Sequence, residues 1–369
     1  MWKLLGVTLF WPAVGMLGCS GPSASDDAHT DSATDTQQVP ARNYDFVVRT
    51  LTIDDRYDVG VAHTGLNIDG LFSGPADADG CNHEDFFSRY DSDQHRPPGC
   101  APMAHGGALL NSPSCAGGVD NQWLQIFNEL QTGRPNVNMR TELLERIFGG
   151  QLTYLIRISE VNDVTTDPMV RVRVWEGYPQ FVDCRSMFSG GAEFSVATST
   201  LGPNGSNIDA DALFNQPGRI EAGRLVVSHG AGAASIRLPV PAVLGGVFLP
   251  SPNGFALRDV RIRLTLSADG VTASDGVIAG WFVGENLIPL CICDDFHTYV
   301  NALLARIVDI RLPGSTVCVD RSIPENPQFG GVSAGVGFTA VRAIIRSQPA
   351  GARVPGMCGS EATDHDGGE

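Results

Sequence analysis

Apolar and polar residues alternate one by one along several segments of the chain, and this alternation decides the expected fold class. The apolar positions are Leu152, Tyr154, Ile156 and Ile158, then Val170, Val172 and Val174, then Ile236, Leu238 and Val240, and finally Val260, Ile262, Leu264 and Leu266. Successive side chains of a β-strand point to opposite faces, so a period of two predicts strands with one buried face. The arginines between them, such as Arg171, Arg173 and Arg263, are expected on a wet outer surface.

Three segments have apolar residues at helical spacing instead. They are 121–131 behind the N-cap Asp120, 140–148 before Gly149-Gly150, and 296–307 behind Asp294-Asp295. Helices and strands do not alternate in the pattern of a parallel α/β sheet, and no repeat of 20–50 residues is present. We therefore predict a mainly β protein: one antiparallel, jelly-roll-like β-sandwich over 43–358, decorated with about three helices.

The N-terminus has the pattern of an exported lipoprotein. One cation, Lys3, precedes an apolar run from Leu4 to Leu17, which is typical of a signal peptide over 1–18. The sequence Leu17-Gly18-Cys19 resembles the lipobox, in which the cysteine thiol receives a lipid. Residues 19–42 are rich in Ser, Thr, Asp and Pro and predict a disordered tether, and 359–369 predict a disordered acidic tail. We expect a lipid-anchored protein at the outer membrane, on its periplasmic or cell-surface face.

Cysteine usage agrees with export. The chain has nine cysteines, and lipidation of Cys19 leaves an even number for disulfides, which persist outside the cytosol. The candidates are Cys81, Cys100, Cys115, Cys184, Cys291, Cys293, Cys318 and Cys358, and their connectivity is open. Zinc is the alternative in the Cys-rich loop 77–118, but only Cys81 and His83 have short ligand spacing, so disulfides are favoured.

The region 66–177 contains Leu66-Asn67-Ile68-Asp69-Gly70, then a cysteine followed by an aspartate, then Gly118-Val119-Asp120-Asn121-Gln122 opening a helix. This order resembles the pattern Leu-Asp-Gly, Cys, Asp and Gly-[Ile/Val]-Asp-Asn-Gln of a family of uncharacterised secreted lipoproteins of myxobacteria-like bacteria. No activity is assigned to such proteins, so the resemblance implies architecture and location only.

The same region suggests a cation site. Calcium prefers six to eight oxygen ligands, and extracellular modules bind it in acid-rich loops. Asp69, Asp85 and Asp120, with a carbonyl of Asn121, converge if the loop folds back onto the start of the first helix. The alternative is that these residues form turns, caps and solvated loops. The sequence therefore predicts Ca²⁺ as a ligand of this region, and no other cofactor is expected.

Function is weakly constrained by the sequence. No Gly-x-Ser-x-Gly elbow or phosphate-binding glycine loop is present. A formal net charge of −16 argues against nucleic-acid binding. We expect a non-enzymatic binding or structural surface module with a carbohydrate or envelope-protein partner. The alternative is a secreted hydrolase that acts on polysaccharide.

Overall fold

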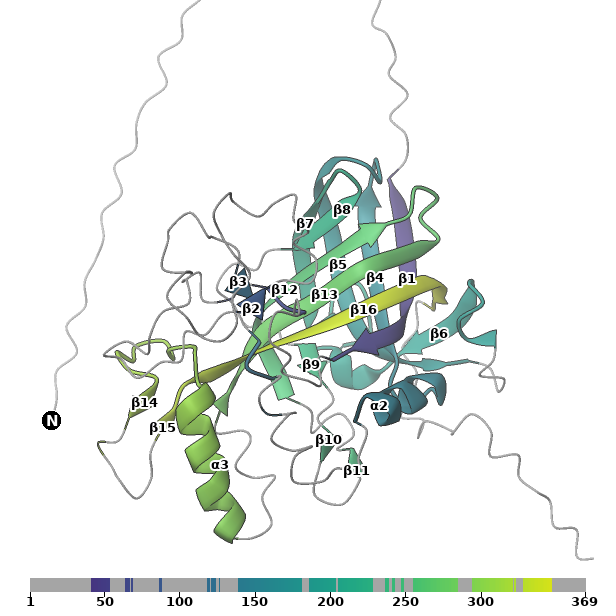
Figure 1. The fold of residues 1–369 in the computed structure, drawn as a ribbon. Coiled ribbons are helices and arrows are strands. Elements are labelled where there is room, and N and C mark those ends of the chain that lie inside the picture. Colours follow the sequence, from purple (N-terminus) through teal and green to yellow (C-terminus); the bar gives the residue numbers. More distant parts are fainter. Residues whose placement is uncertain are drawn as a thin grey trace, which may run out of the picture. The chain divides into compact units, whose positions relative to one another are not determined.

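The computed structural model places the described residues in a single compact unit within Pro40–Glu369 (Figure 1). The described residues are 41–53, 64–66, 68, 86–87, 118–119, 121–123, 126, 139–180, 186–203, 205–227, 236–238, 241–242, 247–248, 255–284, 294–320, 322 and 328–346.

The strands of the main sheet are β1 (Arg42–Thr52), β4 (Tyr154–Val161), β5 (Asp167–Pro179), β6 (Ala192–Val196), β7 (Phe214–Glu221), β8 (Arg224–Val227), β9 (Ile236–Leu238), β12 (Phe255–Leu266), β13 (Thr272–Val283) and β16 (Gly331–Ile345). The short strand pairs are β2 (Phe86–Phe87) with β3 (Gly118–Val119), β10 (Pro241–Ala242) with β11 (Val247–Phe248), and β14 (Val319–Asp320) with β15 (Gln328–Phe329). The helices are α2 (Met139–Phe148), α3 (Asp294–Ile307) and the short 3-10 helix η2 (Thr198–Thr200).

The main sheet closes into an eight-stranded antiparallel β-barrel, so the predicted sandwich is wrong. The ring runs β1-β4-β5-β7-β8-β12-β13-β16, and β1 also pairs with β16. Alternation predicted the inward residues of β5 and β12 correctly, whereas β4 is buried on both faces. It does not show whether the buried face meets a second sheet or the inside of its own closed sheet.

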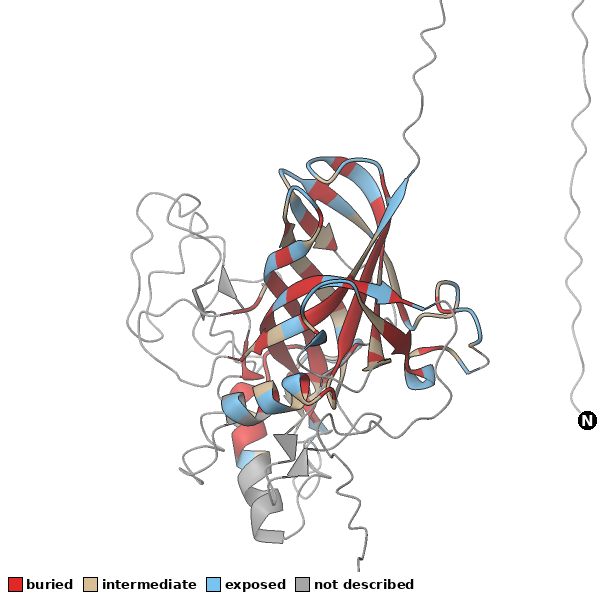
Figure 2. Cartoon of the chain, turned by 90° about the vertical axis from the view of Figure 1, so that its right-hand side faces the viewer, coloured by how far each residue is buried: buried red, intermediate tan, exposed pale blue. Residues whose placement is uncertain are grey.

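Large apolar side chains fill the inside of the barrel. Phe46, Phe214, Phe282 and Phe338 are each at most 2% exposed and belong to one cluster with the inward residues of the other strands. The Phe338 ring lies over Gly276, its neighbour on β13, where an added Cβ would approach the ring to 2.6 Å. Figure 2 shows the buried residues following the strands, while the turns at one end are exposed. The interior is thus a packed core.

Helices cover the end of the barrel away from these turns. Leu143 and Ile147 of α2 and Leu303, Leu304 and Ile307 of α3 join the interior cluster. α2 ends at the predicted glycines, with the Gly149 N–H donating to the Glu145 carbonyl at 2.7 Å. Of the predicted helix 121–131, only 121–123 and 126 are described; Trp123 is helical and packs edge-on against Phe282, with ring centroids 5.3 Å apart.

The opposite end, which we call the hairpin end, consists of the turns 162–166, 222–223 and 267–271 and the start of β1. Ala222 and Gly223 both have positive φ, 51° and 76°, as a two-residue type I′ turn requires. The Gly223 N–H donates to the Thr165 carbonyl at 2.8 Å, which ties two of these turns together. The chain therefore enters the barrel at Arg42 beside these turns (Figure 1).

Asp167 fixes the β4–β5 turn at this end. Its Oδ2 accepts the Asn162 N–H at 2.6 Å, its Oδ1 accepts the Met169 N–H at 3.1 Å, and the residue is 2% exposed. Burial alone would raise the pKa of Asp167, but the donated backbone hydrogen bonds outweigh it, and the net pKa lies below the usual 3.8. The folded state therefore favours the ionised carboxylate.

Replacing Asp167 with Asn should lower the free energy of unfolding by about 1–2 kcal/mol at neutral pH. Because the folded-state pKa is depressed, the stabilisation is present above the unfolded pKa of about 4 and is lost as pH falls below it. Urea unfolding at neutral and at acidic pH measures the free energy of unfolding of both proteins. The difference between wild type and variant should become smaller in acid. Asp163→Asn in the same exposed turn is the control; a gap that is constant with pH would contradict the assignment.

Candidate functional site

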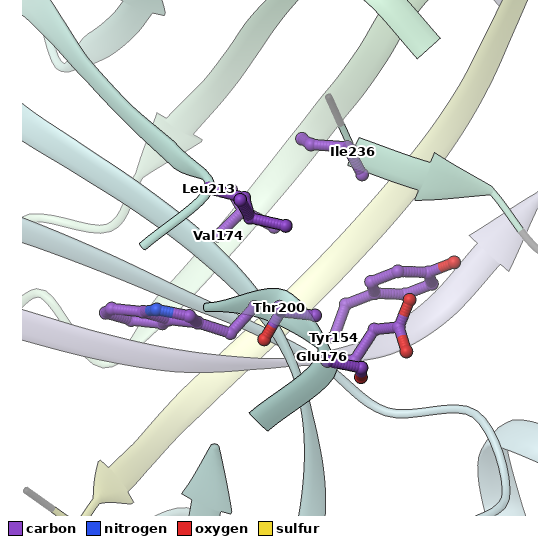
Figure 3. Close-up of a pocket in the computed structure, with 8 residues that line it drawn as sticks. Tyr154, Val174, Glu176, Thr200, Leu213 and Ile236 are labelled. Carbon is purple, nitrogen blue, oxygen red and sulfur yellow. The ribbon is translucent and has the colours of Figure 1, made fainter. Parts of the chain in front are cut away.

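A shallow depression lies at the helix-covered end of the barrel wall, where β4 begins and β5 leaves the ring. Tyr154, the first residue of β4, pairs in register with Glu176 of β5. The two side chains lie beside each other at the depression (Figure 3). Glu176 continues the inward series of Val170, Val172 and Val174, so it is an acid at a position where the alternation requires an apolar residue.

The other walls come from three separate segments. Ser199 and Thr200 come from η2, Leu213 precedes β7, and Ile236 begins β9; Val174 and Trp175 complete the lining (Figure 3). The cavity volume is about 20 Å³, which is room for one water molecule. Leu213 is 39% exposed. A ligand therefore reaches this site from the surface, with at most a small group inserted.

Burial and charge keep the phenol of Tyr154 protonated. Burial raises the pKa of the Tyr154 hydroxyl well above its usual value, and the Glu176 carboxylate raises it further. The pKa of Tyr178 is raised by the same two causes. A general acid or base works best with a pKa near the working pH. Tyr154 is thus poorly suited to transfer a proton.

A loop covers the outer barrel wall next to the depression. We call residues 205–211 the strap. Trp175 donates from Nε1 to the Ile208 carbonyl at 3.2 Å, and Arg173 donates from Nε to the Asp209 carbonyl at 2.8 Å. The strap closes on itself, because Asp211 Oδ2 accepts the N–H groups of Ser206 and Asn207 at 2.9 Å each. Ile208, only 1% exposed, packs in a second apolar cluster outside the barrel.

Arg157 joins the strap to β1 through two carboxylates. Its Nε and Nη2 donate to the two oxygens of Asp45 at 2.7 and 2.8 Å, and its Nη1 donates to Asp209 Oδ1 at 3.0 Å. The Arg157 side chain is 10% exposed and lies over the Trp175 ring, 5.7 Å from its centroid. The hydrogen bond to Asp45 is the main cause that raises the pKa of Arg157. This is a structural ion pair, with each carboxylate engaged by a permanent cation.

The outward arginines do not all face water as expected from the sequence. Arg173 donates from Nη1 to Ser159 Oγ at 2.8 Å, and its side chain is 12% exposed. Arg261 donates from Nη2 to the Ile68 carbonyl at 2.9 Å. The expectation of a wet surface overlooked the loops that cross the barrel wall and offer carbonyl and carboxylate partners.

Most of the predicted cation site lies outside the described residues, including Asp69, Asp85 and Asp120. Asn121 is described and is 1% exposed. Its Nδ2 donates to the carbonyls of Thr64 and Gly335 at 2.6 and 3.1 Å, and its Oδ1 accepts the Gly335 N–H at 3.1 Å. The Asn121 side chain is therefore engaged with backbone groups. Among the described residues no group of three or more His, Cys, Asp or Glu could hold a metal ion, and calcium binding stays a prediction.

Cys318 is buried and disulfide-bonded. Every other cysteine, including the predicted lipidation site Cys19, lies outside the described residues. No helix in the described part of the chain is long and apolar enough to cross a membrane.

Comparison with known proteins gives no family for this barrel. No protein-family model, curated protein or solved structure matches the chain. The resemblance to secreted lipoproteins stays a prediction, and the function has to be argued from the site.

The residues predicted from the sequence do not include Glu176, Arg157, Asp45 or Asp209. Glu176 could have been found from the sequence. It is the next inward position of β5 after Val170, Val172 and Val174, and it is an acid where an apolar residue is expected. No local signal marks Arg157, because its partners lie 112 and 52 residues away in the chain.

Proposed function

We propose that the protein is an exported, lipid-anchored surface module of the outer membrane that binds a carbohydrate or an envelope protein without catalysing a reaction. Cys19 would carry the lipid, and residues 19–42 would form the tether. The observation that carries this proposal is the filled barrel. A packed interior makes a rigid scaffold with its binding groups on the outside, whereas a carrier of apolar ligands needs an internal cavity.

The length of the proposed tether suits this arrangement. Arg42 begins β1 at the hairpin end, and Tyr154 and Glu176 lie toward the other end of the barrel. If residues 19–42 form a flexible tether, its end-to-end distance would be about 25 Å, which would leave room for a partner.

The chemistry of the depression fits a ligand rich in hydroxyl groups. Glu176 supplies a carboxylate acceptor, and Tyr154, whose raised pKa keeps it protonated, lies beside it. Ser199 and Thr200 add hydroxyl groups; Thr200 donates to the Ala197 carbonyl at 2.7 Å, and its oxygen lone pairs can accept. Carbohydrate hydroxyls both donate and accept, and therefore match such a set.

The polysaccharide-hydrolase alternative requires two carboxyl groups facing one sugar bond, about 5–9.5 Å apart. Among the residues lining the depression, Glu176 is the acid present. The described carboxylates of Asp45 and Asp209 lie against Arg157, which holds them in an ion pair.

One incubation separates binding from hydrolysis. The full-length protein, purified in mild detergent and immobilised, is mixed with an outer-membrane polysaccharide fraction, and retained sugar and new reducing ends are both measured. We expect retention without new reducing ends, and about tenfold weaker retention for Glu176→Gln, because a hydrogen bond to a charged group is lost. Glu145→Gln on the exposed face of α2 is the control. Reducing ends that form with wild type and disappear with Glu176→Gln would instead identify a hydrolase.

A further inference from the structure

Arginines concentrate on the outer faces of four neighbouring barrel strands. They are Arg171 and Arg173 of β5, Arg219 of β7, Arg224 of β8, and Arg261 and Arg263 of β12, and we call this set the arginine wall. Each arginine points outward, because its neighbour in the strand, such as Val172, Leu225 or Ile262, points into the barrel. The whole chain has a formal net charge of −16. A cluster of arginines therefore stands out from the negative charge of the rest of the molecule.

The strand register places these side chains close together. Arg219 pairs with Val226, which pairs with Arg263, and Arg224 pairs with Thr265. Diagonal neighbours on adjacent strands lie about 7–8 Å apart. Arg219 and Arg224 are such diagonal neighbours, and so are Arg224 and Arg263. The wall therefore forms a continuous field of guanidinium groups.

Part of this charge is neutralised by acids that lie at the wall. Arg219 pairs with Glu221 at 2.6 Å, and Arg173 lies 3.7 Å from Asp209. Burial is the main cause that lowers the pKa of Arg173; the negative charge of Asp209 raises it, and the positive charges of Arg157 and Arg171 lower it further. Within the wall, Arg171 and Arg173 thus lie near enough to repel each other, and an anionic ligand would relieve this repulsion.

Two members of the wall are exposed to a ligand. The Arg219 side chain is 47% exposed, and Arg224 is exposed as well. The other four, which are Arg171, Arg173, Arg261 and Arg263, are half-buried and add to the positive field beside them. Guanidinium groups bind carboxylates, sulfates and phosphates through two parallel N–H donors, which makes arginine more selective than lysine for planar anions.

We infer that the arginine wall binds an acidic polysaccharide. The inference rests on the proposed function and adds a second contact surface, with the class of ligand, to the depression at Glu176. An eight-stranded barrel turns by about 45° per strand, so β5 and β12 differ by about 135° in orientation. A flexible polyanion can follow this convex wall, whereas a flat membrane meets only part of it at once.

The wall does not suit nucleic acid as well. Single-stranded nucleic acids bind to aromatic side chains on which their bases stack. The outward residues between the arginines are Asn215, Pro217, Glu221, Val226 and Thr265, and none is aromatic. The wall offers charge and hydrogen bonds without a stacking surface.

The test uses polygalacturonate, a polymer of acidic sugars, with uncharged dextran beside it. Full-length protein in mild detergent is compared with Arg219→Glu/Arg224→Glu. The control is Arg42→Glu/Arg49→Glu, two exposed arginines of β1, which lies across the ring from β8. We expect wild type to bind polygalacturonate more tightly than dextran, with affinity that falls as salt rises. The wall variant should bind about tenfold or more weakly, and the β1 variant as tightly as wild type.

A milder pair, Arg219→Gln/Arg224→Gln, removes charge without reversing it and should lie between wild type and the Glu variant. Thermal melting confirms that the variants are folded. Undiminished binding by the Glu variant, or no preference of wild type for polygalacturonate, overturns the inference, while retention of the envelope fraction would still support the proposed function. Tighter, wall-dependent binding to phosphatidylglycerol-containing vesicles or to DNA also overturns it, in favour of a headgroup or nucleic-acid partner.

Discussion

Replacing Arg157 with Met is expected to lower the free energy of unfolding by about 3–5 kcal/mol, because it leaves the partner carboxylates of a buried ion pair without a cation. Asp45 is the partner most affected. Its side chain is 17% exposed and both its oxygens accept from the guanidinium, at 2.7 and 2.8 Å. Urea unfolding at neutral pH and moderate salt measures the loss.

The second half of this prediction concerns the pair as a whole. The free energy needed to remove two charges from water offsets much of their mutual attraction. An apolar pair of similar size can therefore give the same stability. Arg157→Met combined with Asp45→Leu should therefore recover most of the stability lost by Arg157→Met alone. Arg219→Gln, which breaks the exposed pair with Glu221, is the control and should cost at most about 1 kcal/mol. Additive losses in the double variant would contradict a coupled ion pair.

Replacing Asn121 with Ala is expected to cost about 3 kcal/mol or more, since three backbone groups lose a buried hydrogen-bond partner. These are the Thr64 carbonyl and both the carbonyl and the N–H of Gly335. The site is tight, because a Cβ added to Gly335 would come within 2.7 Å of the Thr64 carbonyl oxygen. Water therefore has little room to replace the amide.

Asn207→Ala in the strap is the matched control. Asn207 Oδ1 also accepts two backbone N–H groups, at 3.0 and 3.1 Å, but in an exposed turn where water can replace it. Its loss should cost about 1 kcal/mol. Equal losses for the two asparagine variants in thermal and urea unfolding would show that Asn121 does not hold 64–66 against β16.

The strands were predictable because their signal is local. In β5, Val170, Val172 and Val174 are buried and the arginines between them point outward, as the period of two requires. Gly149 and Gly150 ended α2 where expected. Closure was not predictable, because β1 pairs with β16 across nearly the whole chain, for example Phe46 with Arg342. Local periodicity contains no information on such pairings.

The charged cluster around Arg157 could not be predicted for a related reason. Asp45, Arg157 and Asp209 look like ordinary surface charges in the sequence, and only the fold brings them together. Asn121 was predicted to offer a carbonyl to a cation, and this stays a prediction. The contacts of its side chain were not foreseen: in the fold, the amide bonds to Thr64 and to Gly335 of β16. Glu176 is the exception, since its inward parity could have been noticed in the sequence.

Closure of the ring around a filled interior is the central claim, since it directs the search for function to the outer wall and the depression. Amide hydrogen exchange across all eight strand junctions tests it most directly. In a closed barrel, the hydrogen-bonded amides of β1 facing β16, around Val47 and Leu51, and those of β5 facing β7, around Val172, should exchange as slowly as those between β12 and β13. Rapid exchange along two junctions, as at the open edges of a sandwich, would contradict the closed barrel and the functional argument that rests on it.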